Sequence, residues 1–332
     1  MNTVKVESIS IVIPVKNGGE AFRHCLAHIK AYVPPSIEVI IVADGDTGES
    51  LHLAQASGVQ VLSTPQTSGP ATARNLGARA ARGDILFFVD ADVAIGPDTL
   101  ARVGEIFAQE PELAAVIGSY DDEPGAPNFL SQYKNLFHHH THQIAREEAC
   151  TFWGACGAIR REVFLALGGF DECYRRPSIE DIELGYRLKR AGHRIRLLKT
   201  LQVKHLKRWD TGSLLKADIF YRAVPWVNLI LREGRMVNDL NLRLSSRLSV
   251  MMVYLLVGTL LVSLGWIEVL ALTAVLSCSL LLLNAPTYRF FKRKRGLWFA
   301  VQTVPWHWMY FFYSGLAFSL GLANHVLRRR DA

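Results

Sequence analysis

The chain has 332 residues, half of them hydrophobic, which is enough for one large domain or two modest ones. Its 37 Lys and Arg against 30 Asp and Glu give a formal net charge of +7. No recognisable nucleic-acid-binding motif accompanies this charge, so a nucleic-acid partner is not expected. The five cysteines form no C-x-x-C pair, which argues against a disulfide framework or a structural zinc site, and residues 1–10 lack the apolar core of a signal peptide.

Apolar strands alternate with helices along the first ninety residues. Short runs rich in Ile and Val predict buried strands, and the more polar segments between them have helical patterns. The helix expected from Pro70 to Arg82 is followed by Gly83, which is placed to be its C-terminal cap. Strands are expected at 9–15, 37–42, 59–62 and 85–89, and helices at 20–32 and 70–82. This alternation predicts an α/β fold with a parallel sheet covered by helices on both faces.

Acidic residues follow two of these strands. Asp44 and Asp46 come after the run IEVIIV, and Asp90 and Asp92 come after ILFFV. Ligands of open α/β sheets bind beyond the carboxyl ends of the strands, so these carboxylates are expected on the ligand-binding edge. Four carboxylates on one edge would repel one another unless a cation or a ligand balanced their charge. Asp46 by itself fits a turn better than a ligand site.

The triplet Asp90-Ala91-Asp92 is the strongest candidate for a metal site. Two carboxylates two residues apart can share one divalent cation, and Mg²⁺ or Mn²⁺ prefers oxygen ligands that include substrate phosphates and water. A cation on a diphosphate makes it a good leaving group because it neutralises the developing charge. The alternative interpretation is a pair of solvated turn residues.

Asp44 and Arg74 are candidate contacts for the rest of a nucleotide. A carboxylate at the end of a strand can accept hydrogen bonds from a nucleobase or from ribose hydroxyls, whereas Asp44-Gly45 is also an ordinary turn pair. Arg74 lies early in the helix expected at 70–82, where an arginine suits a base or a phosphate. Its alternative is a surface charge on that helix.

Glu180 and Asp181 begin a further predicted helix, at 180–191. Acids are favoured there by the helix dipole alone, which is the simplest interpretation. A carboxylate held near a donor can also act as a general base that takes the proton from an attacking hydroxyl. Both residues are therefore catalytic candidates.

The sequence HLKRW at 205–209 combines several chemically useful side chains. His205 offers an imidazole for a metal or a diphosphate, Arg208 a cation, and Trp209 an aromatic surface suited to a sugar. The segment could instead be a basic anchor at a membrane surface. The histidines of the run HHHTH at 138–142 cannot all face one ion from a regular helix, and we expect them to form a polar helix end.

The composition changes after about residue 225. We expect a catalytic domain at 1–225, an interfacial amphipathic linker at 226–247 and a membrane domain at 248–332 with about three apolar segments. The basic run 289–295 should face the cytosol under the positive-inside rule. The predicted location is therefore the cytoplasmic membrane, with several crossings and the catalytic domain on the cytosolic face.

From Ile9 to about Trp209 the sequence resembles the family 2 glycosyltransferases. The similarity is carried in order by SIVIPVKN, VADGDT, ATARNLGARAARGDILFFVDADV, GGFDE and EDIELGYRLKRAG. The resemblance implies a GT-A fold, which has a Rossmann-like mixed sheet. It also implies that Asp44 contacts the nucleoside, that Asp92 and Asp90 hold the cation and that Asp181 is the base.

The resemblance further implies an inverting transfer from a nucleotide-diphosphate sugar with uridine or guanosine. The expected acceptor is a lipid or another membrane-proximal molecule. HLKRW is similar to the Q-x-x-R-W of processive polysaccharide synthases, but His205 replaces the glutamine, which favours transfer of a single sugar. A processive synthase is the alternative enzyme, and an inactive membrane adaptor that keeps the fold is the alternative from another class.

Overall fold

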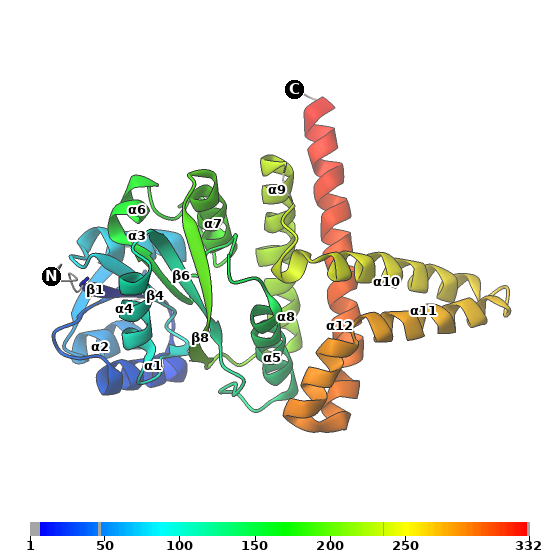
Figure 1. Cartoon of the computed structure of the whole chain (residues 1–332), viewed down its shortest axis with the longest axis horizontal. Helices are drawn as coiled ribbons and strands as arrows, with labels where there is room; N and C mark the ends of the chain where they lie inside the picture. Colours follow the sequence, from blue (N-terminus) through cyan, green and yellow to red (C-terminus); the bar gives the residue numbers. More distant parts are fainter. Residues whose placement is uncertain (1–6, 46–47, 235, 331–332) are drawn as a thin grey trace. The chain divides into compact units, whose positions relative to one another are not determined.

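A computed structural model describes residues 7–45, 48–234 and 236–330 of the chain (Figure 1). The chain divides after Trp209 into two compact units. The composition placed the boundary at 225 instead, because segment 210–225 still carries charges. Asp46 lies outside the described residues.

The first unit is an α/β layer structure, and the described residues of its sheet form eight strands in the order β3-β2-β1-β4-β7-β6-β8-β5. The strands are β1 (Ile9–Val15), β2 (Glu38–Asp44), β3 (Gln60–Thr64), β4 (Ile85–Val89), β5 (Val93–Ala94), β6 (Leu113–Tyr120), β7 (Cys156–Arg160) and β8 (Arg194–His205). The helices are α1 (Gly19–Tyr32), α2 (Glu49–Ala56), α3 (Pro70–Ala80), α4 (Thr99–Gln109), α5 (Phe129–Ile144), α6 (Arg161–Ala166) and α7 (Glu180–Arg190).

The sheet is mixed rather than wholly parallel. Strands β3, β2, β1 and β4 are parallel neighbours, as the alternation predicted. Strand β7 then runs antiparallel to both β4 and β6, and the short β5 runs antiparallel to β8. The fully parallel prediction is therefore wrong for the second half of the sheet, whereas the mixed sheet implied by the resemblance is confirmed.

Helices cover both faces of the sheet. One face packs alternate residues of β1, β2 and β4 against α1, α2 and α4. On the other face the Phe88 ring contacts Phe152, Phe164 and Phe170 at centroid distances of 5.1–6.2 Å. Burying a side chain of this size stabilises the fold by roughly 1.5–3 kcal/mol. The strand ends that carry the acidic residues are thus fixed from two sides.

Two glycines position α3 and β4 at this core. A Cβ on Gly77 would lie 2.5 Å from Val12 Cγ1, so only glycine lets α3 approach β1 this closely. Gly83 is not the helix cap that the sequence predicted, because α3 ends at Ala80 and Ala81 is the cap. Gly83 instead packs against β1, where its N–H donates to Ser10 Oγ at 2.8 Å.

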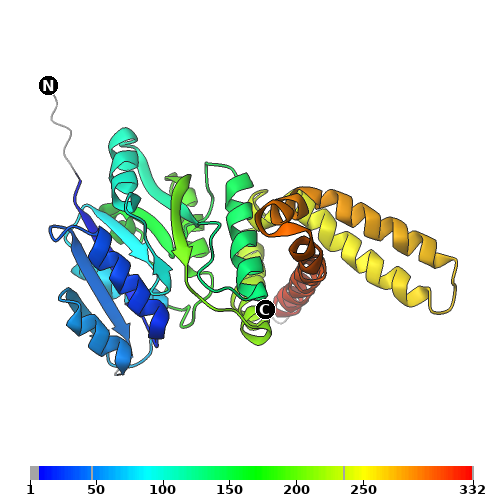
Figure 2. The same ribbon diagram turned by 90° about the horizontal axis from the view of Figure 1, so that it is seen from below.

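The second unit is helical. Its elements are α8 (Thr211–Lys216), the π-helix η1 (Ala217–Ala223), α9 (Val224–Glu233), the 3-10 turn η2 (Leu240–Leu242), α10 (Leu244–Val262), α11 (Val269–Leu283) and α12 (Ala285–Arg330). Helices α10 and α11 lie side by side as a hairpin (Figure 2). Within α12 the backbone breaks at Gly296, whose φ of 86° is left-handed.

One or two stretches of this unit are apolar and long enough to span a membrane. Among the described residues, α10 passes alone with a mean hydropathy of 1.7, and α11 passes only together with Ala285–Ala323, from which it bends by 64°. The structure thus has one or two candidate spans among the described residues, whereas the sequence predicted about three apolar segments. With 15 residues α11 is shorter than the roughly 20 that a crossing needs.

Candidate active site

Asp44 is the last residue of β2, and its carboxylate is hydrogen-bonded to the end of β3 and to the segment between β3 and α3. Oδ1 accepts from Ser68 N at 2.7 Å and from Thr64 Oγ1 at 3.0 Å, and Oδ2 accepts from Gly69 N at 2.9 Å. The side chain is buried, and these three bonds hold the loop that enters α3. A carboxylate has about four acceptor sites, so one remains for another donor.

Arg74 is the centre of the acidic cluster. Its Nη2 bonds Asp90 Oδ1 at 2.6 Å and its Nη1 bonds Glu180 Oε1 at 2.9 Å. The guanidinium lies over the Phe170 ring at 5.4 Å, and a Cβ on Gly154 would be 3.0 Å from its Cζ. Arg74 is therefore a buried link between β4 and α7. The sequence predicted a base or phosphate contact, but this guanidinium is already bound to two carboxylates.

Asp90 and Asp92 differ in their partners, although each exposes about a third of its side chain. Asp90 is paired with Arg74. Asp92 Oδ2 lies 3.6 Å from His205 Nε2, because β5 pairs with β8 and aligns Val93 with His205. Burial favours the neutral form of Asp92, but the charge of His205 and its hydrogen bond lower the pKa to about 2. Asp92 is therefore a carboxylate at neutral pH.

The residues around Asp92 fit a divalent cation only in part. Asp92 and His205 supply an oxygen and a nitrogen that face one another, and Asp90 lies two residues before Asp92. Across the described part of the chain, no cluster of three His, Cys, Asp or Glu side chains could hold a metal ion. A cation here would need phosphate and water oxygens to complete its shell, as Mg²⁺ and Mn²⁺ usually do.

Glu180 and Asp181 take separate positions at the start of α7. Glu180 is buried, pairs with Arg74 and accepts from Ser178 N at 2.9 Å. Asp181 is partly exposed, and its Oδ2 accepts from Gly154 N at 3.1 Å. Burial, together with the charge of Glu180, raises the pKa of Asp181 to about 6. Of the two, Asp181 has the accessibility and the pKa of a general base.

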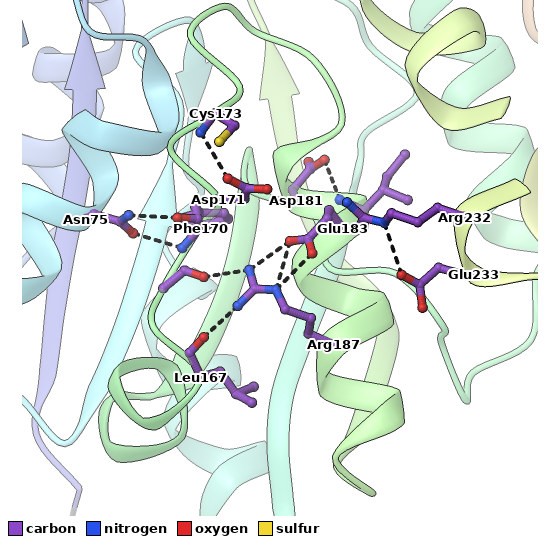
Figure 3. A network of polar contacts seen from close by, with 12 residues as sticks. Asn75, Leu167, Phe170, Asp171, Cys173, Asp181, Glu183, Arg187, Arg232 and Glu233 are labelled. Carbon is purple, nitrogen blue, oxygen red and sulfur yellow. Dashed lines mark hydrogen bonds and ion pairs between the residues drawn. The ribbon is translucent and has the colours of Figure 1, made fainter. Parts of the chain in front are cut away.

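Two side chains for which the sequence predicted no separate role hold the loop at 167–173 (Figure 3). From α3, Asn75 Nδ2 donates to Phe170 O at 2.8 Å, and Asn75 Oδ1 accepts from Phe170 N at 2.9 Å. From α7, Arg187 donates to Leu167 O and Gly169 O, each at 2.6 Å, and pairs with Glu183. The i, i+4 spacing of Glu183 and Arg187 was the available signal.

The HLKRW segment is only partly open. Arg208 is exposed, whereas Trp209 is 4% exposed and Lys207 Nζ lies 4.3 Å from its ring centroid. Trp209 is thus a buried anchor in this structure rather than the open aromatic surface that the sequence suggested. His205 is buried beside Asp92, and its contact with a metal or a diphosphate stays a prediction.

The histidines of α5 are not a polar helix end. His139, His140 and His142 are all buried. The Nδ1 atoms of His139 and His142 lie 2.7 Å and 3.1 Å from carbonyl oxygens of β6. Burial lowers the pKa of His142 to about 4, so its imidazole is neutral at pH 7. The prediction failed because it used the polarity of the side chains and not the face that they occupy.

Comparison with known proteins agrees with this geometry. Residues 10–168 match the glycosyl transferase family 2. The chain carries a family 2 glycosyltransferase domain. The "Pre-mycofactocin glycosyltransferase" of Mycobacterium tuberculosis (strain CDC 1551 / Oshkosh) is 28% identical over 224 residues, which are 64% of this chain and 46% of that protein. This chain therefore spans less than half the length of that relative.

Solved structures of glycosyltransferases share the fold. The mannosyltransferase PcManGT from Pyrobaculum calidifontis, in complex with GDP-Man and Mn²⁺, has a TM-score of 0.59 and 16% identity, and the match covers 94% of this chain and 87% of that one. S. aureus TarS 1-349 in complex with UDP-GlcNAc has a TM-score of 0.52 and 18% identity, with coverage of 70% and 67%. The GT-A mixed α/β sheet of the first unit is confirmed.

Proposed function

We propose that this chain is an inverting glycosyltransferase that moves one sugar from a UDP- or GDP-sugar to a lipid or membrane-proximal acceptor. The observation that carries the proposal is the Arg74 cluster. Arg74 bonds Asp90, which lies two residues before the Asp92 that faces His205. It also bonds Glu180, the neighbour of Asp181, whose pKa is raised. A donor site and a base are thereby held in one constellation.

Asp92 and His205 would hold the divalent cation, with Asp90 beside them. When bound, the cation neutralises charge on the diphosphate and so makes the nucleoside diphosphate a better leaving group. The family 2 domain and the donors in the PcManGT and TarS structures support a nucleotide sugar, with uridine or guanosine. Asp44 has the acceptor capacity left for a nucleoside N–H or O–H.

Asp181 would be the base. In its ionised form it takes the proton of the acceptor hydroxyl while the acceptor oxygen forms a bond to the anomeric carbon. The bond from that carbon to the diphosphate breaks, and the electron pair leaves with the nucleoside diphosphate. Attack opposite the leaving group inverts the configuration. Gly154 N–H and the buried Glu180–Arg74 pair fix the position of Asp181.

The second unit supports a membrane-proximal acceptor. Helix α10 is apolar enough to span a bilayer, and large apolar side chains of α10 and of the turn after it are exposed, among them Leu261, Leu264 and Trp266. Apolar surface of this kind is rare on soluble monomers and is normal against lipid. We therefore place the enzyme at the cytoplasmic membrane, with the catalytic unit on the cytosolic side and the basic run 289–295 facing the same side.

Turnover by the purified full chain tests the proposal. Protein in detergent is given UDP- or GDP-sugars, Mn²⁺ or Mg²⁺ and a membrane lipid extract, and the products are weighed by mass spectrometry. The proposal predicts a lipid heavier by one sugar. A ladder of products would replace single transfer with a processive synthase. Nucleotide-sugar binding without turnover of any donor would make the chain an inactive adaptor.

A further inference from the structure

Helix α5 and Asn128, the residue just before it, present three polar side chains to segment 205–209. Asn128 Nδ2 donates to Trp209 O at 2.7 Å, and Trp209 N donates to Ser131 Oγ at 2.7 Å. Asn135 Oδ1 lies 2.6 Å from His205 Nδ1. Ser131 and Asn135 are four residues apart and share one face of α5, and Asn128 contacts the same segment from the N-cap position, so we call these three residues the stripe. The stripe fixes both ends of HLKRW.

The His205 imidazole is restrained on its other sides as well. The Tyr120 ring stacks on it at 4.2 Å with an interplanar angle of 9°. Leu206 N donates to Asp92 O at 2.8 Å, which ties the backbone after His205 to the metal-site candidate. His205 is 5% and Asn135 1% exposed, so water does not compete for their contact. The ring plane is therefore set, and its Nδ1 partner decides which nitrogen carries the proton.

An amide oxygen at Nδ1 selects one tautomer. A carbonyl oxygen only accepts, so Nδ1 carries a hydrogen, and in the tautomer that can bind a metal the lone pair is on Nε2. That nitrogen is the one that lies 3.6 Å from Asp92 Oδ2. A proton on Nε2 or a metal cation between Nε2 and Oδ2 removes the repulsion between the two facing lone pairs, and a donor-bound cation would take the place of that proton. Hydrogen-bond partners of this kind orient a ligating histidine and raise its basicity.

We propose that Asn135 is a positioning residue that holds His205 as an Nε2 donor for the divalent cation of the sugar-donor complex. The inference rests on the proposed function. Asn128 and Ser131 belong to the same stripe, but their bonds go to the backbone of Trp209 and not to the imidazole. They are therefore natural controls within the stripe.

The test is Mn²⁺ binding by the purified full chain, followed by electron paramagnetic resonance of the free ion. Asn135→Leu keeps a similar volume and removes the acceptor, so it should raise the Mn²⁺ dissociation constant by about 10- to 100-fold. Asn135→Asp keeps an acceptor oxygen at Nδ1 and should bind at least as tightly as the wild type. Ser131→Ala should leave Mn²⁺ affinity unchanged. Saturating Mn²⁺ should restore most of the kcat of Asn135→Leu, which a folding defect would not allow.

Three results would overturn the inference. The first is wild-type Mn²⁺ affinity in Asn135→Leu. The second is a loss of Mn²⁺ affinity in Asn135→Asp as large as in Asn135→Leu, which would mean that the amide donates to Nδ1. The third is a loss of the same size in Ser131→Ala. Asp92→Ala separates this inference from the proposed function. If Asp92→Ala weakens Mn²⁺ binding and Asn135→Leu does not, only the role of Asn135 is lost. If neither changes it, the cation site fails and the inference fails with it.

Discussion

Replacing Arg74 with leucine should destabilise the first unit strongly. The side chains of Arg74 and Glu180 are 6% and 5% exposed, so the substitution leaves a buried carboxylate without its counter-charge. Breaking such a pair costs about 3–5 kcal/mol, whereas an exposed pair contributes about 0–1 kcal/mol. For a unit of this size 1 kcal/mol corresponds to about 2–4 °C, so we expect the Tm to fall by about 6–20 °C.

A thiol-reactive dye measures this transition in detergent. Cys25 and Cys156 are buried in the first unit and become reactive when it unfolds, whereas the exposed Cys173 and Cys278 react from the start. Arg102→Leu is the matched control, since its partner Asp98 is 58% exposed. A Tm for Arg74→Leu within about 4 °C of the wild type would refute the reasoning, because the pair would then behave like a surface pair.

Three other predictions follow from the site and the helical unit. Turnover should rise with pH through about 6, because Asp181 must be ionised to accept a proton. Glu180→Gln should move this acid limb of the pH-rate profile to lower pH, because it removes the charge that raises the Asp181 pKa. A pH-rate profile without an acid limb would contradict this. Asn75→Ala should lower the free energy of unfolding by about 1–3 kcal/mol, measured by urea titration, because Phe170 N and O lose their partner; Thr72→Ala, whose hydroxyl bonds are longer, should have less effect. Glutamine at each position of the exposed run 292–295 should weaken the binding of anionic lipid by about 1 kcal/mol per charge removed, so that native mass spectrometry counts fewer co-purified lipids. An unchanged number of bound lipids would remove this run from the membrane surface.

The first half of the sheet could be predicted because each strand is a continuous apolar run. Strands β1, β2 and β4 are buried on both faces, and such a strand is recognisable in a sequence as a nearly continuous hydrophobic run. Strand β8 could not be predicted in this way, because RIRLLKTLQVKH mixes charged and apolar residues and its buried positions alternate with partly exposed ones. The acidic residues were found because they directly follow the readable strands.

The partners of those acidic residues could not be predicted. Arg74 meets Glu180 across 106 residues of sequence, and Asn135 meets His205 across 70. No local pattern encodes such pairings, which arise only when the sheet brings β4, α3, α5 and α7 together. The number of candidate spans differs from the number of apolar segments in the sequence for another reason. Hydropathy registers apolar residues but not the break at 284 that leaves α11 too short to cross.

The central claim is that a cation held at Asp92 activates a sugar donor. The most direct measurement is the turnover of nucleotide sugar by Asp92→Ala beside Asp98→Ala, an exposed acid outside the site. Loss of several kcal/mol of charge stabilisation predicts that Asp92→Ala turns over about a hundredfold more slowly or worse, at every Mn²⁺ concentration. Asp98→Ala should match the wild type. Equal turnover by the two variants would contradict the account.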